Sequence, residues 1–242
     1  MKQTLLLLAV LALCLAACKR EPDDDPHVPP VNPFIGVWSA EGQHAALEYW
    51  EFRPNGTGGR AAAQAGPFPD DFSFLFFNGK GPKDNVALPG LLILEGSPVT
   101  VTRYGFSIAG NQATLTPVPS ANAITLERVS GSPQVISLTN QLIGEWSAIW
   151  NGDDHDGAIA TWSIKYYDDG TVKTYHHRLH QFENAYALRG NTLVIFGAYR
   201  YTVPVVAEIH QLINGKWHVE EKQSNYGLFE WTYTKVDAAK WK

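Results

Sequence analysis

The stretch Phe34-Ile35-Gly36-Val37-Trp38-Ser39-Ala40 returns almost unchanged as Leu142-Ile143-Gly144-Glu145-Trp146-Ser147-Ala148. In each copy a glycine stands two residues before a tryptophan, at the start of a candidate β-strand. A pattern that recurs at such a distance indicates two copies of one structural unit. The whole chain is organised around these two copies.

Three further landmarks extend the match between the halves. Asn55-Gly56-Thr57 corresponds to Asp169-Gly170-Thr171, and Gly110-Asn111 corresponds to Gly190-Asn191. The sequence 124–129 matches 231–236 near the ends of the two segments. The offsets differ between landmarks, as expected when loop lengths drift between homologous copies. We therefore predict two β-modules, at 34–130 and 139–237.

Each module has the pattern of short strands rather than of helices. Apolar and polar residues alternate over short runs, which Asn-Gly, Asp-Gly and Gly-Asn pairs separate. Gly58 to Gln64 is a weak strand because it is rich in Gly and Ala, and Pro89-Gly90 shortens the apolar run 86–94. The prediction is an all-β chain with two tandem antiparallel barrels of about eight strands each; a pair of β-sandwiches is the alternative.

A Gly-x-Trp pattern on the first strand, with a basic residue near the end of the last, resembles the lipocalin and lipocalin-like families. The resemblance implies a lipocalin-like barrel closed at one end by the indole, with the cation lying across it. Tandem modules of this kind look like the lipocalin-like lipoproteins of Bacteroidetes. The residues implied for these barrel floors are Gly36, Trp38, Arg128, Gly144, Trp146 and Lys235.

The N-terminal segment 1–17 has the features of an export signal. Lys2 precedes an apolar run from Leu5 to Leu15 that is too short to span a bilayer. The sequence Leu-Ala-Ala-Cys ending at Cys18 resembles the bacterial lipoprotein box, which implies an acylated Cys18 and a membrane partner. Lys19 stands where Asp would resemble the inner-membrane retention signal, so the outer membrane is implied. Asp23-Asp24-Asp25 loosely resembles a surface-export tag, and both faces of that membrane stay open.

The residues between the lipid anchor and the first module are expected to form a disordered tether, 18–33. This segment is rich in Pro and Asp and has few apolar side chains. Fully extended, it could hold the first module up to ~45 Å from the membrane.

Composition excludes one class of partner and sets the source of stability. The net charge of −5 with 18% charged residues gives no basic footprint for nucleic acid. The two cysteines, Cys14 and Cys18, lie in the leader and at its cleavage point, so the folded part is expected to have no disulfide. Two domains of about 100 residues each must then be held by their cores.

Aromatic residues on strand positions of the second module could line a barrel interior, which either fills with side chains or keeps room for one small ligand. The first hypothesis is a non-enzymatic lipoprotein whose barrel binds a small apolar or sugar-like molecule. The alternative is an interaction or structural module with filled barrels that contacts a polysaccharide or another, unspecified protein. The ligand-binding candidates are Trp150, Trp162, Tyr166, Tyr201, Trp217, Phe229, Trp231 and Tyr233.

No residue set argues for catalysis, a metal or a cofactor. The chain lacks Gly-x-Ser-x-Gly, a phosphate-binding loop and a Cys nucleophile. On a strand, His176 and His180 would lie ~13 Å apart and could not share a metal. The acidic loop 151–157 fails the spacing of a calcium loop. The segment 56–61 fits a loose dinucleotide fingerprint without the βαβ unit that the fingerprint needs. We predict no catalytic residue, no metal site and no cofactor.

Overall fold

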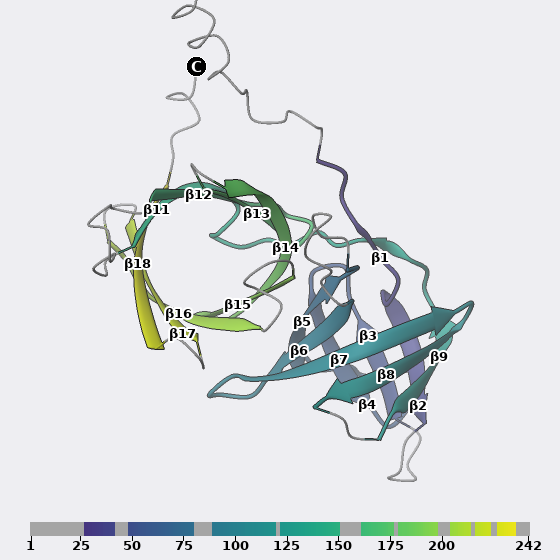
Figure 1. Ribbon diagram of the computed structural model, residues 1–242. Coiled ribbons are helices and arrows are strands. Elements are labelled where there is room, and N and C mark those ends of the chain that lie inside the picture. Colours follow the sequence, from purple (N-terminus) through teal and green to yellow (C-terminus); the bar gives the residue numbers. More distant parts are fainter. Residues whose placement is uncertain are drawn as a thin grey trace, which may run out of the picture.

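The computed structural model describes residues 27–41, 48–79, 89–119, 122–150, 161–176, 179–197, 204–213, 216–223 and 227–235. Within its strands, only the backbone is described at 148–150, 161–162, 175–176, 179–182, 211–213, 217, 221–223 and 227–231. These residues form two closed antiparallel barrels and one two-stranded sheet, seen in Figure 1.

The first barrel closes with eight strands in chain order, the last pairing with the first. The strands are β2 (Gly36–Glu41), β3 (Glu48–Phe52), β4 (Thr57–Ala61), β5 (Phe72–Phe77), β6 (Gly90–Glu95), β7 (Thr100–Ala109), β8 (Gln112–Val118) and β9 (Ile124–Ser130). The weak strand β4 pairs with β5 over only two residue pairs, which agrees with its Gly-rich sequence. The strand after Pro89 begins at Gly90, as the interruption predicted.

The second barrel repeats this order, again with eight strands. The strands are β11 (Gly144–Trp150), β12 (Thr161–Tyr166), β13 (Thr171–His176), β14 (Leu179–Arg189), β15 (Thr192–Gly197), β16 (Val205–Ile213), β17 (Lys216–Gln223) and β18 (Gly227–Lys235). The predicted tandem barrels of an all-β chain are therefore confirmed and consistent with a lipocalin-like fold, and the β-sandwich alternative is wrong. Among the described residues, no helix has the length and apolar character needed to cross a bilayer.

The two ends of each barrel differ. The Gly-x-Trp strand begins at the end that we call the floor, and the opposite end is the mouth. Because successive strands alternate in direction, the turns at 54–56 and 167–170 lie at the floors. Glu95 ends β6 at the mouth of the first barrel, and Gly197 ends β15 at the mouth of the second.

The barrels pack against each other through equivalent strands, β5 and β6 of the first and β14 and β15 of the second (Figure 1). The outer faces of these strands form an apolar cluster between the barrels. Leu94 and Phe196 occupy equivalent positions in it, since Ser73 pairs with Leu94 as Ala185 pairs with Phe196. The interface is thus related by an approximate two-fold axis. Its members are Leu75, Phe77, Leu92, Leu94, Ala185, Ala187, Val194 and Phe196.

The linker between the barrels also makes equivalent contacts to both. The Ser137 amide donates to the Pro54 carbonyl and the Leu138 amide to the Asp168 carbonyl, both at 2.6 Å. Pro54 and Asp168 precede the matched Asn-Gly and Asp-Gly turns at the two floors. The Leu138 side chain packs against the cores of both barrels.

The expected disordered tether differs from the structure over its last residues. Residues 27–35, which we call the strap, lie against the folded part of the chain. Strand β1 (Val31–Asn32) pairs with β10 (Gln134–Val135) in the linker. The Asn32 side chain accepts a hydrogen bond from the Phe34 amide at 2.9 Å, as Asn140 does from Leu142. Backbone pairing with the linker orders a segment whose composition alone predicts disorder.

Candidate functional site

Both barrel floors are built in the same way. The indoles of Trp38 and Trp146 are buried. Each indole N–H donates to the carbonyl four residues earlier, that of Phe34 or Leu142, at 2.6 Å. This bond holds the ring across the barrel end, because a buried indole N–H needs an acceptor.

A cation lies over each indole, on the last strand of each barrel. The guanidinium carbon of Arg128 is 4.1 Å from the centre of the Trp38 ring, and Lys235 Nζ is 5.4 Å from that of Trp146. Arg128 also donates to the Ile35 carbonyl at 2.8 Å. Burial lowers the pKa of Arg128. Each contact adds about 0.5 to 2 kcal/mol.

The two floor glycines differ in how much space they have. Gly36 and Gly144 have φ of +127° and +125°, a region that disfavours side chains. A Cβ on Gly36 would lie 2.2 Å from the Ser130 carbonyl oxygen. At Gly144 the nearest atom would be Cε of Lys235, a flexible side chain, at 3.4 Å. The first floor therefore requires glycine more strictly.

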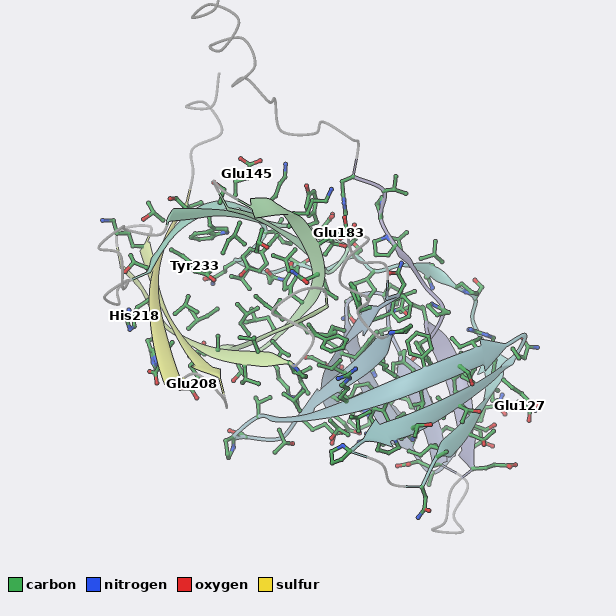
Figure 2. The ribbon with its side chains drawn as sticks, viewed as in Figure 1. Glu127, Glu145, Glu183, Glu208, His218 and Tyr233 are labelled. Atoms are coloured by element: carbon green, nitrogen blue, oxygen red, sulfur yellow. The ribbon has the colours of Figure 1, made fainter. Side chains whose placement is uncertain are left out.

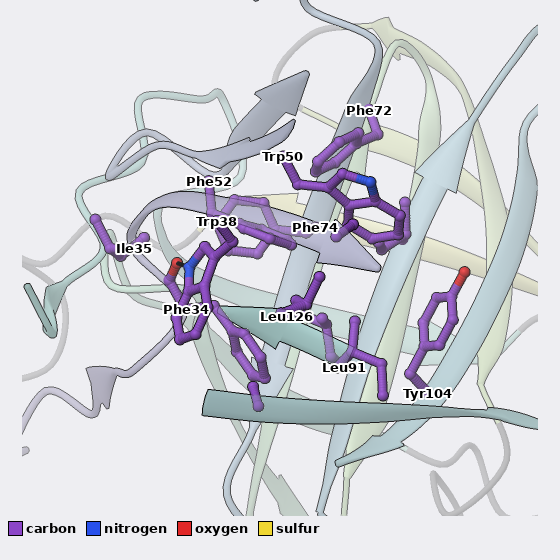
Figure 3. Packing of buried hydrophobic residues seen from close by; sticks show 14 of the residues in the cluster. Phe34, Ile35, Trp38, Trp50, Phe52, Phe72, Phe74, Leu91, Tyr104 and Leu126 are labelled. Carbon is purple, nitrogen blue, oxygen red and sulfur yellow. Dashed lines mark hydrogen bonds between the residues drawn. The ribbon is translucent and has the colours of Figure 1, made fainter. Parts of the chain in front are cut away.

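Aromatic rings fill the interior of the first barrel, as Figure 3 shows. Phe34 lies 5.8 Å from Phe52 and 5.2 Å from Phe106, and Phe52 lies 5.1 Å from Phe74, measured between ring centres. The second and third of these pairs meet edge to face, at 88° and 90°, and the first pair is tilted at 46°. This barrel is a packed core from its floor upward.

An ion pair among aromatic rings closes the upper part of the same interior. The guanidinium of Arg60 lies 4.4 Å from the ring centre of Trp50 and 5.1 Å from that of Phe72. Arg60 Nη1 also contacts Glu95 Oε1 at 2.5 Å. Burial raises the pKa of Tyr104 nearby, against the positive charge of Arg60. Arg60, Phe72, Glu95 and Tyr104, which we call the mouth plug, cover the aromatic core.

The strand register identifies which residues replace the mouth plug in the second barrel. Arg60 pairs with Trp50, which pairs with the floor tryptophan of its barrel. Thr174 pairs with Ile164, which pairs with the other floor tryptophan. Followed strand by strand, the register matches Arg60 to Thr174, Phe72 to Asn184, Glu95 to Gly197 and Tyr104 to Ala207. In these four matches the second barrel has the smaller side chain, whereas its Val172 and Tyr233 are larger than the matched Gly58 and Leu126.

The replacements also bring buried polar groups into the second barrel. Thr174 is 0% exposed, and its hydroxyl oxygen has no hydrogen-bond partner among the residues that the structure describes. Asn184 and Tyr166 are also buried. Buried hydroxyls in native proteins nearly always have a partner. The partner of this hydroxyl is therefore a side chain outside the described ones, a water molecule or a ligand.

Of the eight predicted ligand residues, the side chains of Tyr166 and Tyr233 are described, and both are buried in the core of the second barrel. Figure 2 shows Tyr233 directed inward. Trp150 pairs with Trp231, and Trp217 pairs with Tyr233. Their positions thus share the face of Tyr233.

The remaining candidates are placed in part. Trp162 pairs with His176, and Phe229 pairs with Glu221. The structure describes only the backbone of Trp162, Phe229 and their strand partners His176 and Glu221. The same holds for Trp150, Trp217 and Trp231. Tyr201 lies outside the described residues. The register brings the strand candidates to one face of the sheet, and Glu221 joins them there because it also pairs with Ala207.

Sequence reasoning missed the residues that distinguish the barrels. Arg60 and Thr174 stand at the same distance after the matched Asn-Gly and Asp-Gly turns, so extending that match by three residues would have revealed their exchange. The other exchanges lie beyond loops of unequal length. No sequence signal aligns them without the strand register.

Only part of the motifs considered in the sequence falls on described residues. Residues 57–61 form a strand of the first barrel rather than a nucleotide loop. In the described ranges, no three His, Cys, Asp or Glu side chains lie together as a metal site would need. His177 and the loop 151–157 lie outside these ranges.

Comparison of the chain with protein-family models, with curated proteins and with solved structures found no match. A function for this chain must therefore be inferred from its sequence and from the geometry described above.

Proposed function

We propose that this chain is a non-enzymatic, lipid-anchored protein of the outer membrane whose second barrel binds a small apolar or sugar-like molecule. The anchor is the acylated Cys18 that the lipoprotein box implies. The first barrel is the filled partner that supports the second. The lipid anchor places the protein at either the periplasmic or the outer face of that membrane.

The observation that carries this proposal is the exchange of the mouth plug between the barrels. Two barrels of the same strand number and register enclose similar interiors. Four large side chains fill that space in the first, whereas Thr174, Asn184, Gly197 and Ala207 stand in their places in the second. The loss of side-chain volume at these four positions favours room for a ligand, as in barrels that hold one small molecule.

The side chains around this space favour a neutral ligand with hydroxyl groups. Thr174 and Asn184 offer hydrogen-bonding groups deep in the barrel, among aliphatic and aromatic side chains. The positions of Trp150 and Trp231 lie nearer the mouth, and aromatic faces there suit a sugar ring or an apolar chain. The position of Glu221 on the same face disfavours an anionic ligand such as a fatty-acid carboxylate.

Native mass spectrometry of the chain from Lys19, purified without detergent, tests the proposal. We expect a small molecule to co-purify and to be released by mild organic extraction. Ala207→Tyr copies the residue of the first barrel into the second and should abolish binding by filling the space. The matched control is Glu208→Tyr, one residue along on the outer wall, where Figure 2 shows the side chain pointing outward.

Two results would refute this proposal. The first is a bare mass together with no uptake of oligosaccharides, haem or fatty acids. The second is a stability loss of about 3 kcal/mol in Ala207→Tyr, which would show that the space is already filled. A substitution at Gly197 is less suitable, since a Cβ there would lie 2.6 Å from Asn184 Oδ1.

The alternative, an interaction module with filled barrels, has one observation in its favour. The first barrel is filled and closed by the mouth plug, so any role beyond support belongs to its outer surface. If the second barrel proves filled too, the search should turn to protein or polysaccharide partners of the envelope.

A further inference from the structure

The strap ties the N-terminal end of the folded part to the floor of the second barrel. The His27 ring stacks on Tyr167 with 3.8 Å between ring centres and 25° between planes. His27 Nε2 contacts the carboxylate of Asp169, which is buried and also accepts a hydrogen bond from the Thr171 amide. Tyr167 and Asp169 belong to the turn between β12 and β13, at the floor of that barrel.

The strap and its partner strand expose apolar side chains. Val28 is 77% exposed, Val31 56% and Val135 39%. Val31 and Val135 are direct partners in the pairing of β1 with β10. Among the described residues only one other large apolar side chain is exposed, Val118 on the first barrel. We call Val28, Val31 and Val135 the valine patch.

The length of chain before the strap limits its distance from the membrane. Nine residue steps separate Cys18 from His27. At about 3.1 Å per residue, they would span about 28 Å. The sequence alone allowed ~45 Å, because it counted the strap as free tether. Docking of the strap therefore keeps the point of attachment, at the floor of the second barrel, close to the lipid anchor.

We propose that the floor end of the second barrel, with the valine patch, faces the lipid bilayer, and that the mouth of this barrel points away from it. The inference rests on the lipid anchor of the proposed function. The occupant of the patch is the headgroup region of the bilayer, where exposed apolar side chains lose contact with water. The carboxylate of Glu145 near this end is paired with Lys165, at 2.9 Å. A ligand would then enter the second barrel from the aqueous side.

Site-directed spin labelling tests this orientation, because the chain has no cysteine after Cys18. Nitroxide labels are placed on Val135→Cys and on the matched control Val118→Cys, which is 47% exposed on the first barrel. The acylated protein is reconstituted into phosphatidylcholine vesicles and compared with the soluble chain from Lys19. The measured quantity is the ratio of collisions with oxygen to collisions with a nickel chelate, which rises inside a bilayer.

We expect a several-fold rise of this ratio at Val135 on membrane attachment and no change at Val118. A second variant, Val31→Asp in the chain labelled at Val135, should reduce the rise, because a carboxylate is costly to place against the acyl boundary. An unchanged ratio at Val135, a larger rise at Val118, or no effect of Val31→Asp would overturn the proposed orientation.

The mass of the N-terminal peptide separates this inference from the proposed anchor. Acylated protein with a low ratio at Val135 refutes the orientation alone. An unmodified Cys18 in protein extracted from membranes refutes the anchor and the orientation together. Ligand binding by the second barrel is measured on the soluble chain and is independent of both outcomes.

Discussion

The two barrels share strand number, register and floor, yet their interiors are filled in different ways. The first has tilted and edge-to-face aromatic rings closed by the Arg60–Glu95 ion pair. The second has a mixed aliphatic and aromatic core with buried polar groups, and Thr174 stands at the position of Arg60. The comparison teaches that the floor and the turns are shared by both barrels, whereas the upper interior differs between them. Substitutions that exchange or remove matched residues test that view.

The largest effect is expected at the interface that both barrels share. Phe196 is buried, 5.9 Å from the Phe77 ring centre and 4.7 Å from the guanidinium carbon of Arg103. Phe196→Ala should lower the free energy of unfolding by about 3–5 kcal/mol through the cavity that it leaves. Leu94→Ala, the matched change on the first barrel, should cost about 2–4 kcal/mol.

Chemical denaturation of both interface variants measures these losses. If the barrels stabilise each other, the transition should also broaden or split as they unfold separately. A loss below about 1 kcal/mol in Phe196→Ala would show that the barrels are independent and would remove the basis for treating one as support for the other.

The second comparison concerns the floor glycines. Gly36→Ala should cost about 2–4 kcal/mol, since strain at positive φ adds to a clash with the Ser130 carbonyl. Gly144→Ala has the same strain, but only a flexible lysine nearby, and should cost about 1–2 kcal/mol. Thermal unfolding of both variants ranks them. The reverse order would mean that the two floors are not built alike.

The mouth plug itself is the third test. Arg60→Thr copies the second barrel into the first, removing a cation from two rings and leaving Glu95 unpaired. We expect a loss of about 1–2 kcal/mol, because Arg60 is partly exposed. The control Lys165→Thr breaks an exposed ion pair with Glu145 and should cost at most about 1 kcal/mol. Urea titrations measure both losses. If Arg60→Thr and Lys165→Thr lose the same free energy of unfolding, the mouth plug stabilises the barrel no more than an exposed ion pair does.

The smallest effect is expected at Tyr186, which stands where the first barrel has Phe74. Its hydroxyl donates to the Tyr167 carbonyl at 2.8 Å and accepts from Asn140 at 3.4 Å. Tyr186→Phe should therefore cost about 1 kcal/mol at neutral pH.

This difference should depend on pH in a defined direction. Burial raises the pKa of Tyr186, so the unfolded chain loses this proton first, above about pH 10. The stabilisation is complete below that pH and is lost as the pH rises further. The stability gap between the wild type and Tyr186→Phe should shrink above about pH 10. Denaturation at a series of pH values measures this difference. A difference in free energy of unfolding that stays constant above about pH 10 would contradict the burial of Tyr186.

Much of the fold could be predicted from the sequence because its signals are local. The repeated Gly-x-Trp, the turn dipeptides and strand alternation are all readable within a few residues. The order of the strap could not be predicted in this way. Its partner strand begins at Gln134, far along the chain, and a polar, Pro-rich segment shows no sign of such a partner.

The candidate site could be predicted only in part, for a similar reason. Aromatic residues at alternate positions indicate a face, and the register of Trp150 with Trp231 agrees with it. Whether a barrel is filled depends on side chains from many strands. Arg60, Glu95 and Tyr104 meet through closure of the sheet, which no single stretch of sequence reveals.

The equivalent strands at the interface have a consequence for the history of the chain. A surface that packs against its own copy around a two-fold axis is the surface of a symmetric homodimer. A single-module ancestor with this surface would have paired with a second copy, and duplication within one gene would then have joined the pair. After such a fusion the copies no longer had to be identical. One barrel could become a filled support, while the other kept or acquired an interior that could hold a small ligand.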